Sequence, residues 1–149
     1  MQPGILLRDY VDEDYPALMD LWESANLSNR ARGDNKETIG ATLQHGGRLI
    51  VLLYEDRLIG SSWITNDGRR LYLHHFGIHP DFQGKGLAHL LTKASLEYAI
   101  KLKMQIKLEV HHTNDSAIAL YKKYGFHYLG DYDVYIIRDP DSISADQGL

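Results

Sequence analysis

HPDFQGKGLA, residues His79 to Ala88, is the most informative stretch of this chain. An apolar, strand-like run ends at His79-Pro80, and an amphipathic helical pattern begins directly after Gly86. A helix N-terminus exposes unpaired backbone N–H groups and carries about half a positive charge, so it attracts phosphate or pyrophosphate. Gly84 and Gly86 would let the backbone approach such an anion because neither has a Cβ, and Lys85 would add a charge-assisted contact. A simple tight turn is the alternative interpretation.

The two common phosphate-binding motifs do not fit this stretch. A P-loop requires GxxxxGK[ST], and a dinucleotide-binding fold requires GxGxxG directly after an early strand. Here a lysine stands between the glycines, and the segment lies in the middle of the chain. The sequence therefore indicates an anion-binding loop of another kind.

Hydrophobic periodicity on both sides of the loop predicts a mixed α/β domain. Helices are expected from residue 12 or 14 to 25, over 36–45, from 86 onward and over 115–124, and the polar stretch 26–35 is expected to be a loop. Strands are expected over 4–10, 48–54, 58–65, 70–78 and 104–110, and two closing strands over 126–129 and 133–138.

Composition restricts the function further. The 149 residues, 44% of them hydrophobic, predict one domain over 1–140 followed by a polar tail over 141–149. Cysteine is absent, which excludes disulfides, thiolate metal sites and a cysteine nucleophile. The net charge of −4 and the lack of a basic block argue against nucleic acid as a partner. Neither a secretion signal nor a membrane span is apparent, so we expect a cytoplasmic protein.

A second motif lies downstream, where residues 114–126 read NDSAIALYKKYGF. Together the two motifs resemble those of small, single-domain members of the GNAT N-acetyltransferase superfamily. The signature [QR]-x-x-G-x-[GA] of that family, between its fourth strand and third helix, is matched by Gln83, Gly86 and Ala88. The pattern N-x-x-A-x-x-L-Y-x-x-x-G-F is matched at Asn114, Ala117, Leu120, Tyr121, Gly125 and Phe126.

The resemblance implies the GNAT (acyl-CoA N-acyltransferase) fold, in which a mixed, mostly antiparallel twisted sheet is splayed between strands four and five and has helices on both faces. Acetyl-CoA would lie in the splay. The implied activity is direct acetyl transfer, in a ternary complex, to a primary amine of a small molecule or of a peptide N-terminus. A non-catalytic acyl-CoA-binding sensor module is the alternative function, and a homodimer is compatible with either.

The resemblance also assigns cofactor contacts. Loop 83–88 would hold the CoA pyrophosphate through backbone N–H groups, and the strand end before it would pair with the pantetheine arm as an added strand would. The expected cofactor-binding residues are Phe76, Gly77, Ile78, Gln83, Gly84, Lys85, Gly86, Leu87, Ala88, Asn114 and Tyr121.

Tyr121 is the predicted general acid. When an amine attacks a thioester, the leaving thiolate must be protonated, and a phenol with an ordinary pKa of about 10 can donate that proton. Simple packing in the core is the alternative role for Tyr121. Tyr124, three residues further on, is expected to pack rather than react.

Two residues compete as the proton acceptor that frees the attacking amine. Glu109 resembles the glutamate of the ribosomal-protein N-terminal acetylases, although a salt bridge on the strand surface beside Lys107 would explain it equally well. Histone-type members carry their glutamate where this chain has Tyr72, so that version of the mechanism is not preserved. His74, expected on the same face as Tyr72, is the second candidate because imidazole titrates near neutral pH.

The remaining candidates concern metal and acceptor. His74-His75 and His111-His112 suggest a metal site, but strand neighbours point to opposite faces and no carboxylate completes a ligand set, so no metal is expected. Arg32 and Asp34, in the loop before the second helix, would bind the carboxylate and the ammonium of an amino-acid-like or peptide acceptor. A solvated loop is the alternative there.

Overall fold

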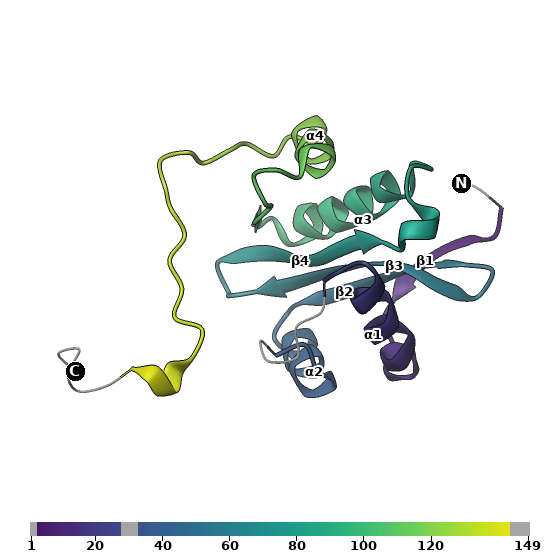
Figure 1. Ribbon diagram of the computed structural model, residues 1–149, viewed down its shortest axis with the longest axis horizontal. Helices are drawn as coiled ribbons and strands as arrows, with labels where there is room; N and C mark the ends of the chain where they lie inside the picture. Colours follow the sequence, from purple (N-terminus) through teal and green to yellow (C-terminus); the bar gives the residue numbers. More distant parts are fainter. Residues whose placement is uncertain (1–2, 28–32, 144–149) are drawn as a thin grey trace.

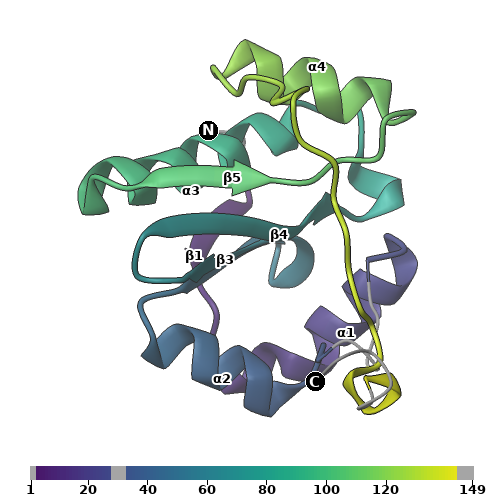
Figure 2. The ribbon, with the colours of Figure 1, turned by 90° about the vertical axis from the view of Figure 1, so that its left-hand side faces the viewer.

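Five strands form one sheet, in the order β1-β2-β3-β4-β5. Strands β1 to β4 are labelled in Figure 1 and β5 in Figure 2. The computed structural model describes residues 3–27 and 33–143 of the chain. All neighbouring strands are antiparallel except β4 and β5, which are parallel. The strands are β1 (Ile5–Asp9), β2 (Arg48–Tyr54), β3 (Arg57–Asn66), β4 (Arg70–Ile78) and β5 (Gln105–Leu108).

Helices cover both faces of the sheet (Figure 2). Helix α3 lies on one face with α4 beyond it, and α1 and α2 lie on the other. Asn35 begins α2, because its Oδ1 accepts the backbone N–H of Thr38 at 2.8 Å. The helices are α1 (Tyr15–Ser24), α2 (Lys36–Gln44), α3 (Leu87–Leu102) and α4 (Asp115–Lys123), with short 3-10 turns η1 (Asp12–Asp14), η3 (Pro80–Phe82) and η4 (Pro140–Ser142).

Strand β2 is buried on both faces and joins two hydrophobic clusters. Its residues Ile50 and Leu52 belong to the cluster beneath α3, whereas Leu49, Val51 and Leu53 belong to the cluster beneath α1 and α2. This alternation explains why the run is almost wholly apolar: each face of the strand has a helical layer to pack against.

Strands β4 and β5 separate halfway along β4. Their parallel pairing runs from Arg70 opposite Gln105 to Leu73 opposite Leu108, where β5 ends. Strand β4 continues to Ile78 and, within the described residues, its last part has no partner on the β5 side. The sheet is thus splayed between its fourth and fifth strands, and the predicted fold class is confirmed.

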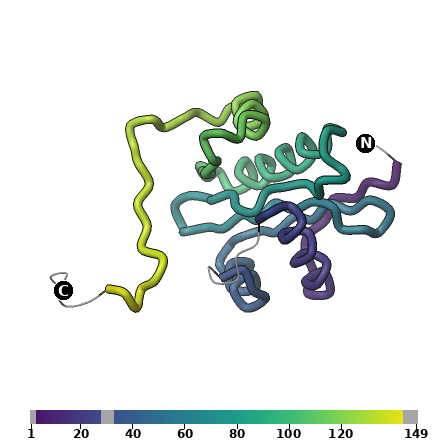
Figure 3. The backbone as a smooth tube through the Cα atoms, viewed as in Figure 1, coloured from purple at the N-terminus to yellow at the C-terminus, as the bar shows by residue number. Residues whose placement is uncertain are grey.

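The two predicted closing strands are wrong. Beyond α4 the described chain contains no strand; it leaves the body of the molecule as an extended segment (Figure 3). Tyr128 and Tyr135 are 89% and 91% exposed there. A strand requires a hydrogen-bonded partner, and residues 126–138 make no ladder with β5, so their apolar pattern was not sufficient to form one. Within residues 3–27 and 33–143, no helix has the length and apolar character needed to cross a bilayer.

Candidate active site

A cavity of about 770 Å³ opens where β4 and β5 separate. Its lining comes from the segment just after α1, from β4, from the loop before α3 and the start of that helix, from the end of β5 and from α4, so it reaches both faces of the sheet. It brings together every predicted cofactor-binding residue except Lys85: Phe76, Gly77, Ile78, Gln83, Gly84, Gly86, Leu87, Ala88, Asn114 and Tyr121. Both predicted proton acceptors, Glu109 and His74, line the same cavity.

The loop before α3 is held in a left-handed conformation at two glycines. Gly84 has φ +77° and Gly86, the residue that precedes α3, has φ +78°. A Cβ added at either position would meet no atom within 4 Å, so the space in front of both is open. Gln83 ties the loop to the end of β4, because its side-chain Nε2 donates a hydrogen bond to the backbone carbonyl of Ile78 at 2.9 Å. The first amides of α3 therefore face an open space of the kind that suits an anion.

Lys85 is oriented differently from its neighbours. Its ammonium lies 5.6 Å from the ring centroid of Phe82, in a cation–π arrangement, and Lys85 does not line the cavity. Its contact with an anion stays a prediction.

Tyr121 is held at the cavity wall by two aromatic side chains. Its ring meets Phe76 edge-on at 5.8 Å between centroids and Phe126 at 5.6 Å, and the residue is only 9% exposed. Burial raises the pKa of the Tyr121 phenol to about 12, so the hydroxyl stays protonated at every ordinary pH. Tyr124, by contrast, bonds His89 Nδ1 through its hydroxyl at 2.9 Å and links α4 to α3.

Asn114 caps α4. Its Oδ1 accepts the backbone N–H of Ala117 at 3.3 Å, which fixes the start of the helix that carries Tyr121. The motif therefore has a structural role as well as a place on the cavity wall.

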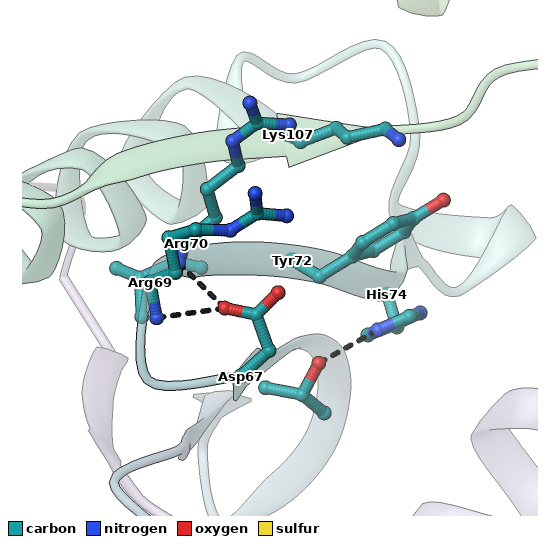
Figure 4. A pocket seen from close by; sticks show the side chains of 8 residues that line it. Asp67, Arg69, Arg70, Tyr72, His74 and Lys107 are labelled. Atoms are coloured by element: carbon teal, nitrogen blue, oxygen red, sulfur yellow. Dashed lines mark hydrogen bonds between the residues drawn. The ribbon is translucent and has the colours of Figure 1, made fainter.

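A second, smaller cavity of about 240 Å³ adjoins the first and shares Tyr72 and His74 with it (Figure 4). The Tyr72 ring stacks on His74 at 4.4 Å, and the Lys107 ammonium lies 5.6 Å from the same ring. Arg69 and Arg70 line the cavity beside them. The only acid in its lining, Asp67, accepts the backbone N–H groups of both arginines at 2.8 and 2.7 Å, which lowers the pKa of its carboxyl group. The lining therefore carries a surplus of positive charge.

Asp34, a predicted acceptor-binding residue, does not line either cavity. Asp34 is buried in front of α2, where its carboxylate accepts a hydrogen bond from His75 Nε2 at 2.8 Å. Arg32 lies outside the described residues. Glu109 follows β5, and its carboxylate neighbours the Tyr72 hydroxyl; burial first, and then this carboxylate, raise the pKa of Tyr72.

The histidine pairs do not lie as the strand pattern predicts. His111 and His112 follow the end of β5 rather than lying on it, and both are exposed. His74 and His75 lie on one face of β4 rather than on opposite faces, since both rings lie beside Trp63. The centroids of their rings are 6.2 and 5.2 Å from the centroid of the Trp63 ring. Among the described residues, no three or more His, Cys, Asp or Glu side chains gather as a metal site would require.

A family model described as "Acetyltransferase (GNAT) family" matches residues 11–126, which cover the loop, the cavity and α4. The chain belongs to the GNAT acetyltransferase family. It is therefore an acyltransferase, as the two sequence motifs predict.

Relatives and solved structures agree with this assignment. An acetyltransferase of Pectobacterium atrosepticum is 30% identical to this GNAT chain over 119 residues, which cover 78% of the chain and 84% of the relative. The ribosomal-protein-S18-alanine N-acetyltransferase of Escherichia coli superposes with a TM-score of 0.71 at 20% identity, over 83% of this chain and 77% of that one. A putative acetyltransferase of Salmonella typhimurium, solved with its cofactor acetyl-CoA, superposes with a TM-score of 0.69 at 19% identity, over 83% of this chain and 80% of that one.

The residues that line the main cavity of this acetyltransferase fit the shape and the polar groups of acetyl-CoA. The open space in front of Gly84 and Gly86 admits phosphate oxygens to the first amides of α3. The unpaired end of β4 offers backbone N–H and C=O groups to the amides of an extended pantetheine arm. Gly77 allows Leu27 to pack closely against this part of β4, since a Cβ there would lie 2.8 Å from Leu27 Cδ1.

His74 of the acetyltransferase should make the fold sensitive to acid. Burial lowers the pKa of His74 to about 4, so between pH 6.5 and 4 the unfolded chain binds a proton that the native state does not. Stability is therefore lost as the pH falls through this window. In His74→Gln, the loss of unfolding free energy between pH 7 and pH 4 should be smaller by about 2 kcal/mol, after allowance for partial exposure.

Urea unfolding of both proteins at the two pH values measures this difference. The exposed His45 offers the control, because His45→Gln should lose stability with acid as wild type does. Equal losses in wild type and His74→Gln would show that His74 is protonated alike in the folded and unfolded states.

Proposed function

We propose that this acetyltransferase moves the acetyl group of acetyl-CoA to a primary amine of a small molecule or a peptide N-terminus, directly and within a ternary complex. The observation that carries the proposal is the single cavity that contains the glycine loop, Tyr121 and the polar face of β4. No cysteine is present to carry the acetyl group, which favours direct transfer.

The acyl donor would enter from the side of α3 and α4. Its pyrophosphate would bind at Gly84 to Ala88, and its pantetheine arm would run along the free end of β4. The thioester would then lie beside Tyr121, whose ring contacts Phe76.

Tyr121 would protonate the sulfur as the C–S bond breaks. Its hydroxyl keeps its proton because burial raises the pKa to about 12, so a neutral phenol is available to donate a hydrogen bond to the sulfur as negative charge develops there. Glu109 and His74 both reach the cavity from the acceptor side and stay the predicted proton acceptors.

The second cavity favours an acceptor that carries a carboxylate beside its amine. Arg69, Arg70 and Lys107 supply positive charge next to His74, at a place continuous with the main cavity. A free amino acid or a peptide with an acidic residue has this combination of charges. The acetyltransferase of Escherichia coli described above acts, by its name, on an alanine of ribosomal protein S18. Arg32 and Asp34 stay predicted contributors from the loop before α2.

CoA release from acetyl-CoA tests the proposal. The acceptor panel would contain amino acids, polyamines, aminoglycosides and peptide N-termini, with acidic and neutral peptides matched in length. Turnover of one class supports the proposal, and a preference for the acidic peptide supports the charge argument. Acetyl-CoA binding without turnover of any amine would favour the sensor module, and a failure to bind acetyl-CoA would contradict the site itself.

A further inference from the structure

Strand β4 contains a bulge at His75. The pairing with β3 shifts there: Ser61 lies opposite Gly77 and Trp63 opposite His74, so one residue of β3 faces two of β4. His75 has φ +44°, a left-handed conformation that is costly for a residue with a side chain. The bulge turns the His75 ring onto the face that already carries His74.

Hydrogen bonds from neighbouring elements hold this costly conformation. The indole N–H of Trp22 donates to Ser61 Oγ at 2.8 Å, and the Ser61 hydroxyl donates to the carbonyl of His75 at 2.8 Å. Trp22 is fully buried in α1, so the helix fixes the bulge through Ser61. Backbone strain that is retained by such a network occurs most often at functional sites.

The imidazole of His75 is oriented by a buried carboxylate. Its Nε2 lies 2.8 Å from Asp34 Oδ2, and the Asp34 side chain is only 4% exposed. The ring packs against Trp22 at 4.4 Å and Trp63 at 5.2 Å between centroids. Since the carboxylate accepts a hydrogen bond from the Nε2–H group, the neutral ring carries its lone pair at Nδ1. Among the described residues, no hydrogen bond engages Nδ1.

His75 lines the same cavity as Tyr121, and its side chain is 19% exposed. The ring therefore combines an oriented tautomer, a rigid support and access to the reaction space. The two proton acceptors predicted from the sequence, His74 and Glu109, lack this combination. His74 is tied to the Thr65 hydroxyl at 2.9 Å and, with a pKa lowered to about 4, is a weak base. Glu109 is exposed and lies against the Tyr72 hydroxyl.

We propose that His75 is the proton acceptor for the amine and that Asp34 is its positioning residue. The inference rests on the proposed function and gives Asp34 a role through His75 in place of direct contact with the acceptor. Among residues 3–27 and 33–143, the charged and titratable groups around His75 are Asp34 before α2, His74 on β4 and, beyond His74, Glu109 after β5; α1 and β3 contribute the uncharged Trp22 and Trp63.

The protons balance as follows. The ammonium of the acceptor gives one proton to His75 Nδ1, and the neutral nitrogen forms its bond to the acetyl carbon. The C–S bond then breaks, and Tyr121 donates its proton to the sulfur. The second proton that leaves the nitrogen restores Tyr121 through solvent, and His75 releases the first proton to solvent. The products are the amide, CoA thiol and one proton.

The test is the pH dependence of kcat/KM for wild type, His75→Gln and Asp34→Asn. Glutamine keeps a donor for Asp34 but accepts no proton. At neutral pH, we expect His75→Gln to lower kcat/KM about 100-fold and Asp34→Asn about tenfold. The deficit of His75→Gln should shrink toward high pH, where the amine loses its proton without help, so the rate of this variant should keep rising with pH until the free amine predominates. A merely structural role of His75 would not produce this pH dependence.

Control variants and control measurements separate a catalytic role of His75 from a structural one. His45→Gln, far from the cavity, should behave as wild type, and acetyl-CoA affinity and melting temperature should be close to wild type in His75→Gln. If His75→Gln keeps the wild-type rate and pH profile, or if His74→Gln or Glu109→Gln instead shows a deficit that shrinks toward high pH, the inference is overturned while the proposed function stands. Wild-type enzyme that releases no CoA with any amine overturns the proposed function, and this inference with it.

Discussion

Replacing Tyr121 with phenylalanine is expected to lower kcat about 100-fold, with acetyl-CoA affinity within about threefold of wild type. The phenyl ring would keep both edge contacts, with Phe76 and Phe126, so the cavity wall should keep its shape. Only the proton for the leaving sulfur is lost. Because the pKa of Tyr121 is about 12, its titration should not appear in the pH profile below about pH 11.

Steady-state kinetics with the best acceptor, together with a direct acetyl-CoA titration, measures both quantities. Tyr124→Phe is the matched control: it removes a phenol from the same helix and breaks only the bond to His89. Its rate should stay within about threefold of wild type. Equal rates for wild type and Tyr121→Phe would show that solvent protonates the sulfur and that Tyr121 serves packing alone.

The second large effect is expected at Gly86. In Gly86→Val, a branched side chain would fill the open space before α3 and displace the pyrophosphate from the first amides of the helix. A loss of roughly 2 kcal/mol in binding corresponds to about a 30-fold higher Kd for acetyl-CoA. The left-handed φ of +78° would also cost the fold about 1–2 kcal/mol.

A control at another turn separates these two effects. Gly68 has φ +86° and, like Gly86, no atom within 4 Å of an added Cβ, but it lies in the turn between β3 and β4. Gly68→Val should therefore lower the melting temperature by a similar amount and leave the Kd unchanged. If both variants weaken acetyl-CoA binding equally, the loop before α3 is not where the pyrophosphate binds.

Local pattern and motif predicted most of the fold. The strands over 48–54 and 70–78 were correct to the residue, because the first is an almost wholly apolar run that ends in turn residues and the second lies between a turn and a proline. The sequence also predicted the splay, through the family resemblance. The prediction of the closing strands was wrong because a strand needs a hydrogen-bonded partner. The local sequence of residues 126–138 does not show whether they pair with β5.

The site was predicted in part. The glycine loop and Tyr121 lie in contiguous motifs, so a single sequence reveals them. His75 was missed as a site residue because strand alternation places it opposite His74, and the bulge that reverses this depends on Trp22 and Ser61, far away in the chain. The contact of His75 with Asp34 joins residues 41 positions apart and has no local signal.

The extended segment after α4 has a practical consequence for handling the protein. Three exposed tyrosines, Tyr128, Tyr132 and Tyr135, lie there on an open backbone, which is the substrate form that chymotrypsin cleaves fastest. Every residue that lines the main cavity precedes them, the last being Tyr121. A nicked preparation would thus run as a shorter band on a gel and still contain the whole lining of the cavity.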